Sequence, residues 1–283
     1  MSRVIDIGGI RITALNDGTV RLPPMYYPGL DFAVHPELVE SDGTYHLPIG
    51  SFLIQADGAT ILVDAGIGPR SIPFPADIAN AAGLEHPPAD IATGGLLPEA
   101  LAAAGVVPAD ITAVFLTHLD ADHVGWIAVD DALFFPDAEV VCSAIDLAVP
   151  PGSAPGEAEG RAGLAVAQGA GQLRPVDAAA VELAPGVTAR HAPGHTPGHF
   201  IVVVSARGQE ARMFGDAVHH PLQLNDTGIS FLLESDPGHA LRTREALLAD
   251  AQDRGVWVNM AHFPGLAFHR ISVERGQRRW VPA

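Results

Sequence analysis

The chain has 283 residues, of which 48% are hydrophobic, so it can bury a core large enough for one large domain or two small ones. Its formal net charge is −17, from 16 Lys and Arg against 33 Asp and Glu, which disfavours binding to the phosphate backbone of nucleic acids. No apolar run reaches the length of a membrane span, and we expect no signal peptide, because the first residues lack a basic start and an apolar stretch.

The first third of the sequence predicts two β-hairpins. Each joins two short β-type runs through a glycine-containing turn: residues 4–7 and 10–15 around Gly8-Gly9, and residues 51–55 and 60–64 around Asp57-Gly58. Residues 69–92 are rich in Pro and Ala without clear periodicity, so we expect a long loop there, placed as a lid near a site. Residues 96–104 predict a helix with Thr93 as its cap and Gly105 as its end.

A dense polar cluster follows the next predicted strand, residues 111–116, which is β-branched, contains an aromatic residue and is expected to be buried. The residues directly after it place four ligand-type side chains within six positions: His118, Asp120, Asp122 and His123. At the end of a strand such side chains can converge on one point, and imidazole and carboxylate are ligands of divalent metals. A solvated polar turn is the alternative, and the density of these residue types argues against it.

The second half of the chain continues the pattern of strands and helices. We expect a strand around Cys142, a loop at 150–156, a helix at 164–173, strands at 187–191, 200–204 and 212–214, a helix at 238–253 and a strand at 256–260. This order indicates sheets covered by helices on their outer faces. Because Cys142 is the only cysteine, no intrachain disulfide can form, which is consistent with the cytoplasm.

Three further ligand-type residues each follow one of these predicted strands: His195, Asp216 and His262. A single histidine after a strand is usually structural, whereas several strand ends that deliver His or Asp indicate one shared site. Together with the cluster they give seven candidate ligands, which is too many for one tetrahedral ion. They suit two ions that share a bridging carboxylate.

These residues resemble the metallo-β-lactamase superfamily, whose loop reads His-x-His-x-Asp-His and is followed by a later His, a bridging Asp and a last His. The matching positions here are His118, Asp122, His123, His195, Asp216 and His262. Residues 51–54, 61–66, 194–199 and 215–216 are similar to other family segments, so the resemblance covers most of the chain. Residues 95–97, 104–105, 261–265 and the helix around Arg242 and Arg244 are most similar to the branch of methyl parathion hydrolase and quorum-quenching lactonases.

The resemblance implies an α/β protein, an αββα sandwich, formed as a single domain by residues 1–283. It implies one ion held by His118, position 120, His195 and Asp216, and a second held by Asp122, His123, His262 and Asp216. A hydroxide that bridges the ions would attack a small ester, lactone or phosphotriester, and Asp122 would be catalytic by orienting it. We expect a small-molecule substrate as the partner, and neither nucleic acid nor a membrane. A homodimer is compatible with the resemblance.

Asp120 departs from the family pattern, because it stands where the family has its second histidine. A carboxylate is a hard, anionic ligand and shifts the preference of the first site from Zn toward Mn or Fe, although Zn remains the first expectation. A carboxylate at this position resembles flavodiiron proteins, which carry Glu there, and the nuclease-like domain of competence proteins. The alternatives are therefore a di-iron or mixed-metal oxidoreductase and a weakly catalytic metal-dependent metabolite-binding protein.

Several other residues have a functional and a structural interpretation. We expect His199 to support the loop of His195, and Asp64 to support the site as its family counterpart does, from outside the ligand set. His219 or His220 could line the pocket as an acid, with a merely polar role as the alternative. A packing role is expected for each of the following aromatic residues, with the wall of a substrate cleft as the alternative: Tyr26, Tyr27, Tyr45, Phe32, Phe52 and Trp126. Specificity is expected in loops 20–48, 69–92 and 150–162.

Overall fold

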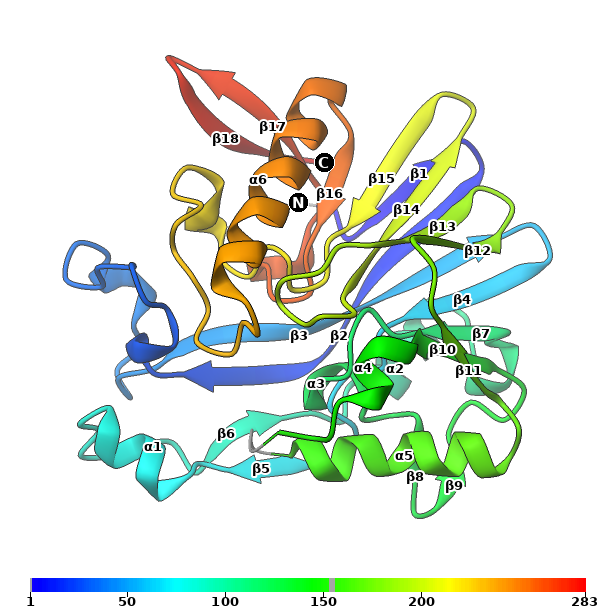
Figure 1. Ribbon diagram of the computed structural model, residues 1–283, viewed down its shortest axis with the longest axis horizontal. Coiled ribbons are helices and arrows are strands. Elements are labelled where there is room, and N and C mark those ends of the chain that lie inside the picture. The colour runs from blue at the N-terminus through cyan, green and yellow to red at the C-terminus, as the bar shows by residue number, and fades with distance from the viewer. Residues whose placement is uncertain (1, 153–155) are drawn as a thin grey trace.

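The computed structural model describes residues 2–152 and 156–283, in which two β-sheets pack face to face with helices on both outer faces (Figure 1). Apolar side chains from both sheets meet between them, among them Phe52, Phe115, Phe200 and Phe268. Burial of this apolar surface holds the two layers together. The expected αββα sandwich is therefore confirmed.

The first sheet has nine strands in the order β11-β10-β7-β4-β3-β2-β6-β5, with β1 paired to β2. Its strands are β1 (Val4–Ile7), β2 (Ile10–Leu22), β3 (Tyr45–Ala56), β4 (Ala59–Val63), β5 (Ser71–Pro73), β6 (Asp90–Thr93), β7 (Ala113–Phe115), β10 (Glu139–Ser143) and β11 (Leu173–Val176). Both predicted hairpins are confirmed, because β1 pairs antiparallel with β2 and β3 pairs antiparallel with β4. Strands β4, β7 and β10 are parallel, so the segments that follow them leave the sheet at one edge.

The second sheet has seven strands in the order β12-β13-β14-β15-β16-β17-β18. They are β12 (Ala180–Ala184), β13 (Val187–His191), β14 (Phe200–Ala206), β15 (Gln209–Met213), β16 (Trp257–Asn259), β17 (His269–Glu274) and β18 (Gln277–Pro282). Strand β14 is antiparallel to both β13 and β15, and β16 is parallel to β15. Strands β13, β15 and β16 therefore run in the same direction, and the residues after each of them meet at one edge.

Helices cover the outer face of each sheet. α2 (Leu97–Ala103) and α5 (Glu157–Gly169) lie on the first sheet and α6 (Pro237–Arg254) lies on the second. The other helices are α1 (Ala76–Ala81), α3 (Ala121–Val124) and α4 (Ala144–Ala148). Short 3-10 turns lie at Pro24–Tyr26, Pro36–Leu38, Pro108–Asp110, Pro221–Leu224 and Pro264–Leu266, and β8 (Ala128–Val129) forms a ribbon with β9 (Ala132–Leu133). Leu101 of α2 and Leu164 of α5 pack on the first sheet, and Leu248 of α6 packs on the second. None of the helices in the described part of the chain is long and apolar enough to cross a membrane.

Three expectations about local structure are wrong. Residues 69–92 are not a structureless loop, because they contain β5, α1 and part of β6, and such short pairings leave no periodicity in the sequence. The helix expected at 164–173 begins earlier and ends at Gly169, since Leu173 pairs with Val140 in a parallel strand. Thr93 belongs to β6 and caps no helix; the first turn of α2 is held by the carboxylate of Asp17 instead. Within the loop expected at 150–156, residues 153–155 lie outside the described part.

Candidate metal centre

The seven residues proposed as metal ligands all lie at the edge where strand ends of the two sheets face each other. The loop after β7 carries His118 and Asp120, and α3 directly continues it with Asp122 and His123. From the second sheet, the ligand-type residues that follow β13, β15 and β16 are His195, Asp216 and His262. The structure thus brings together positions that are far apart in the sequence, because the strands that precede them run in matched directions.

Two groups of donor atoms can be distinguished. In the first, Oδ2 of Asp120 lies 3.6 Å from Nε2 of His118 and 3.3 Å from Nε2 of His195. In the second, the carboxylate of Asp122 lies 3.8 Å from Nε2 of His123 and 3.4 Å from Nε2 of His262. Ligand atoms about 2.1 Å from a tetrahedral ion are separated from one another by about 3.4 Å. Both groups have the spacing that a bound divalent ion requires.

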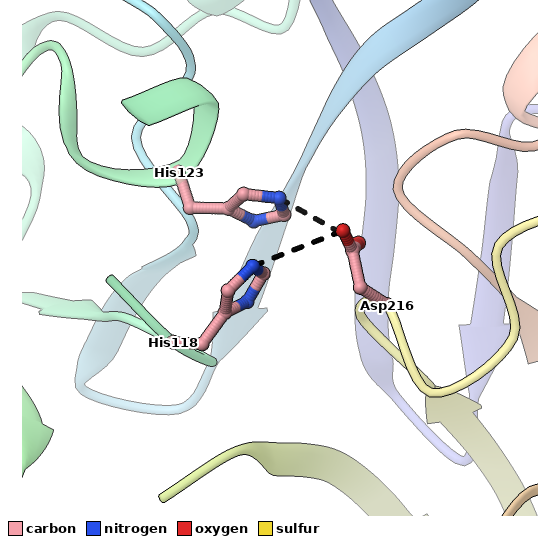
Figure 2. Close-up of side chains that lie close together, drawn as sticks. All are labelled: His118, His123 and Asp216. Carbon is pink, nitrogen blue, oxygen red and sulfur yellow. Dashed lines mark ion pairs between the residues drawn. The ribbon is translucent and has the colours of Figure 1, made fainter. Parts of the chain in front are cut away.

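Asp216 lies between the two groups. Its Oδ1 is 3.5 Å from Nε2 of His123, and its Oδ2 is 3.8 Å from Nε2 of His118, 3.7 Å from Nε2 of His195 and 3.4 Å from Nε2 of His262. Figure 2 shows His118 and His123 pointing toward the Asp216 carboxylate from the opposite side of the centre. The Asp216 carboxylate therefore faces imidazoles of both groups.

Three of the donor atoms are buried without a protein partner, a condition that a bound cation would satisfy. Among the described residues, no hydrogen-bond partner is found for Nε2 of His118, Nε2 of His123 or Oδ1 of Asp216. Their side chains are almost completely buried. Leaving buried polar atoms unpaired costs about 1–3 kcal/mol each, so a site with several of them is unfavourable unless something binds there. These residues therefore fit a divalent metal.

The charges within the centre favour ionised carboxylates. Burial raises the pKa of Asp216, but the imidazoles of His262 and His123 outweigh it and hold this pKa well below its ordinary value. Burial also raises the pKa of Asp120, but the imidazoles of His118 and His195 outweigh it and hold this pKa well below its ordinary value. Anionic oxygens are the form in which carboxylates bind metals.

Each of three histidines is oriented by an acceptor at its Nδ1. Nδ1 of His262 donates to the carbonyl of Pro48 at 2.8 Å, and Nδ1 of His123 lies 3.1 Å from Oδ2 of Asp64. Nδ1 of His118 lies 3.0 Å from Oγ1 of Thr117, whose own proton is directed to Asp64. The hydrogen bonds at His262 and His118 hold the proton on Nδ1, and the Asp64 carboxylate beside Nδ1 of His123 favours the same tautomer there, so the lone pair on Nε2 faces the centre.

Asp64 was expected to support the site from outside the ligand set. In the structure it directly contacts the loop that carries His118 and Asp120. Its Oδ1 accepts a hydrogen bond from the backbone N–H of Thr117 at 2.8 Å, and the residue is completely buried. Its backbone has φ 61°, a left-handed conformation that is uncommon for a residue with a side chain. Such strain is tolerated where the surrounding contacts fix the position.

His199 supports the centre from the second sheet, as expected. Its Nδ1 donates to the carbonyl of Ala192 at 3.2 Å, which leaves Nε2 to accept the backbone N–H of Asp216 at 3.1 Å. The imidazole therefore fixes the backbone of the central carboxylate. His199 uses both ring nitrogens in these bonds and has none left for a metal.

Asp146, in α4, was not recognised from the sequence as part of the site. Its carboxylate accepts from Oγ1 of Thr196 and from the backbone N–H of Gly198, each at 2.7 Å. It thus holds the loop that carries His195. The only local signal is Ser143, which caps the first turn of α4 through its side chain and so positions Asp146.

Arg244 holds the loop that follows Asp216. From α6 its buried guanidinium donates to the carbonyls of Ala217 at 3.1 Å and Thr227 at 2.8 Å, and it pairs with the buried carboxylate of Glu234. Breaking such a buried pair is costly, because it leaves an uncompensated charge. This helix therefore fixes the loop that carries His219 and Phe231.

A cavity of about 660 Å³, counting the part that is continuous with solvent, lies over the ligands. Its polar side consists of Asp120, Asp122, Asp216, His219 and His262, and its apolar side consists of Val20, Leu22, Tyr26, Ile67, Ile72, Ile91, Ala92, Ala121, Phe231 and Leu233. No Lys or Arg is among these lining residues. A negative charge on a substrate would therefore meet no cationic side chain of Lys or Arg in the walls.

The aromatic residues considered for the walls of the cleft mostly have packing roles instead. Of the proposed aromatic residues, Tyr26 lines the cavity, whereas Phe52 packs between the sheets and Trp126 packs under the first sheet, where it donates to Asp17 at 2.8 Å. The aromatic wall is instead Phe231, whose sequence context carries no signal of this role. Residues 69–92 contribute through Ile72 and Ile91, which their short strands present to the cavity.

Comparison with known proteins places this site in a family context. The model of the metallo-beta-lactamase superfamily matches residues 46–262. The fold is similar to that of AidC, a dizinc quorum-quenching lactonase, at 21% sequence identity and a TM-score of 0.80 over 99% of this chain and 96% of that chain. It is similar to the hydrolase AbOPH (22%, TM-score 0.75, 99% and 96%) and to a probable metal-dependent hydrolase from Staphylococcus aureus (18%, TM-score 0.78, 99% and 99%). No protein with a curated description matches the sequence significantly.

Proposed function

The chain belongs to the metallo-beta-lactamase superfamily, and from this premise we propose that it is a dinuclear metal-dependent hydrolase of small esters, lactones or phosphotriesters. The observation that carries the proposal is the position of Asp216, whose carboxylate lies beside His118 and His195 of the first group and beside His123 and His262 of the second. A single carboxylate in this position is the arrangement expected of two ions that share a ligand. The neighbouring structures named above are hydrolases, which supports the same reaction class.

In the proposed centre, His118, Asp120, His195 and Asp216 hold one divalent ion. The second ion is held by Asp122, His123, His262 and Asp216. Zn is the expected metal at both positions, and Asp120 makes the first position more favourable for Mn or Fe than a third imidazole would. A partial exposure of 29% for the Asp120 side chain leaves it accessible from the cavity.

The ions, when bound, would supply Lewis acidity and lower the pKa of a shared water molecule. The protein residues then have to orient the reactants. Asp122 lines the cavity and keeps 21% of its side chain exposed, so one of its oxygens can accept a proton or hold a water in line with the substrate. Asp64 and Asp146 hold the two loops of ligands rigid, which is what precise alignment of the reacting atoms needs.

The cavity favours an uncharged substrate with an apolar group. Its walls are mainly aliphatic, with Phe231 and Tyr26 as aromatic surfaces, and they offer no cationic side chain. A carboxylate elsewhere on the substrate would lose its hydration and find no partner in these walls. We therefore expect neutral lactones and aryl esters to be better substrates than β-lactams that carry a carboxylate.

The proposal is tested by metal analysis of the purified protein, followed by activity measurements after loading with Zn, Mn and Fe. We expect about two ions per chain and hydrolysis of a neutral lactone or aryl ester in a panel that includes a phosphotriester and a β-lactam. The variant His262→Ala should lose one ion and the activity, whereas His86→Ala, at an exposed position, should change neither. Two bound ions without hydrolysis of any panel member would contradict the proposal.

A second function, a di-iron or mixed-metal oxidoreductase, has one observation in its favour. Asp120 contributes a carboxylate oxygen 3.3 Å from Nε2 of His195, and such a ligand suits iron better than imidazole does. Iron at about two per chain, with redox turnover and no hydrolysis, would favour this function over the first. Tight binding of a lactone without turnover would instead indicate a metabolite-binding protein.

A further inference from the structure

A hydroxyl faces the Nδ1 of His219, as one also does at His118. The hydroxyl of Tyr27 lies 2.8 Å from this nitrogen. The corresponding group at His262 is a backbone carbonyl, as it is at His199. A carbonyl can only accept, whereas a hydroxyl carries a proton of its own. The hydroxyl of Thr117 directs its proton to Asp64, whereas the hydroxyl of Tyr27 finds no second acceptor among the described residues, so its proton bears on the tautomer of His219.

The hydroxyl proton of Tyr27 determines which nitrogen of His219 carries the hydrogen. A buried tyrosine keeps its hydroxyl proton at neutral pH, and the Tyr27 hydroxyl has no other hydrogen-bond partner within residues 2–152 and 156–283. If Nδ1 carried the hydrogen, the proton of Tyr27 would be buried without an acceptor, which costs about 1–3 kcal/mol. The favoured arrangement has Tyr27 donating to Nδ1, and the hydrogen of the imidazole then lies on Nε2.

The Nε2 atom of His219 faces the cavity beside the central carboxylate. It lies 3.5 Å from Oδ2 of Asp216, and His219 is one of the residues that line the cavity. The ring is stacked on Phe231, with 4.0 Å between centroids and an angle of 15° between planes. This stacking and the Tyr27 bond fix the ring on two sides, so the direction of Nε2–H is set before a substrate arrives.

We infer that His219 is a further catalytic residue that donates a hydrogen bond from Nε2 to the reacting oxygen of the substrate, and that Tyr27 is the positioning residue that fixes this tautomer. The inference rests on the proposed hydrolase function. When a nucleophile attacks a carbonyl or phosphoryl centre, negative charge develops on its oxygen. A preformed neutral donor at the wall stabilises this charge without having to reorganise. A protonated Nε2 has no lone pair, so the same arrangement excludes His219 as a metal ligand.

The tautomer can be measured without turnover, by long-range ¹H–¹⁵N NMR of the imidazoles in the zinc-loaded protein, with the His219 signals assigned by their loss in His219→Gln. We expect an unprotonated Nδ1 and a protonated Nε2. Tyr27→Phe should convert this signal to a mixture or to the other tautomer. The matched control is Tyr45→Phe, which removes a buried hydroxyl without a partner from the same aromatic cluster and should leave the signal unchanged. Protonated Nδ1 in the unaltered protein would overturn the inference.

Kinetics test the role of the donor. His219→Leu should lower kcat by about 100-fold, with two ions retained and KM changed less than threefold. His219→Gln, which restores an N–H donor, should recover most of that loss, and Tyr45→Phe should match the unaltered protein. Equal kcat in the Leu and Gln variants would overturn the inference even if the tautomer is as expected. If the unaltered protein hydrolyses no substrate, the proposed function has failed and not the inference about His219. The tautomer measurement then decides whether His219 is a hydrogen-bond donor or a metal ligand.

Discussion

Oδ2 of Asp64 lies 3.1 Å from Nδ1 of His123, while Oδ1 of the same carboxylate accepts the backbone N–H of Thr117 at 2.8 Å. Asp64 follows β4 and the ligand loop follows β7, and these strands are parallel neighbours. One buried carboxylate therefore contacts both an imidazole of the second donor group and the start of the loop that carries the first.

Asp64→Asn should weaken metal binding by about 10- to 100-fold, because an amide is a poorer acceptor for the imidazole hydrogen and lowers the basicity of Nε2. Zinc affinity measured by competition with a chromogenic chelator tests this expectation. Asp57→Asn, an exposed change in the turn between β3 and β4, is the matched control and should leave the affinity unaltered. Equal affinities in the two variants would show that Asp64 does not act on the metal.

The convergence of the candidate ligands could be predicted from the sequence because they follow apolar strands, and such a strand end is visible as a local pattern. Asp146 could not be predicted, since its importance comes from the contact with Gly198, in a loop distant in the sequence. Phe231 was missed for a similar reason: it belongs to an irregular segment that Arg244 holds in place from α6. Local periodicity predicts strands and their ends, whereas contacts between loops depend on the packing of the whole chain.

Asp120→His should raise the affinity of the first position for Zn relative to Mn. The change replaces a hard anionic oxygen with a borderline imidazole nitrogen and removes one negative charge beside His195. Titration of each metal against a competing chelator, with the Asp120→Asn variant for comparison, gives the ratio of the two affinities. Unchanged affinities for both metals in the His and Asn variants would mean that Asp120 is not a ligand.

Asp17→Asn should destabilise the fold by about 3 kcal/mol or more. The completely buried carboxylate accepts five hydrogen bonds: from the backbone N–H groups of Ile67, Gly68, Gly95 and Leu97 and from the indole of Trp126. In either orientation, an amide would place its NH₂ against at least two of these donors, and hydrogen bonds to a charged group contribute about 1.5–3 kcal/mol each. Urea unfolding measures the change, with Asp6→Asn as a control at an exposed turn. A difference below about 1 kcal/mol between the two variants would contradict this account.

The stability of the protein should fall as the pH is lowered through the range in which His220 would take up a proton. Burial, and to a smaller extent His35, lowers the pKa of His220 from 6.5 to about 4. Its Nδ1 accepts the backbone N–H of Leu222 at 3.0 Å, and its ring packs against Tyr27 and Tyr45, so the folded protein favours the neutral imidazole.

Because this pKa is lower in the folded state, the unfolded chain binds more protons between about pH 6.5 and pH 4. The contribution of His220 is therefore fully present above pH 6.5 and is lost as the pH falls through about 4; at pH 5 the loss is about 2 kcal/mol. His220→Asn keeps an acceptor near the position of Nδ1 but does not titrate. In urea unfolding of the zinc-loaded proteins at pH 7.5 and pH 5, the decrease in the free energy of unfolding should be about 2 kcal/mol smaller for the variant. Equal decreases would show that His220 is not held neutral by the fold.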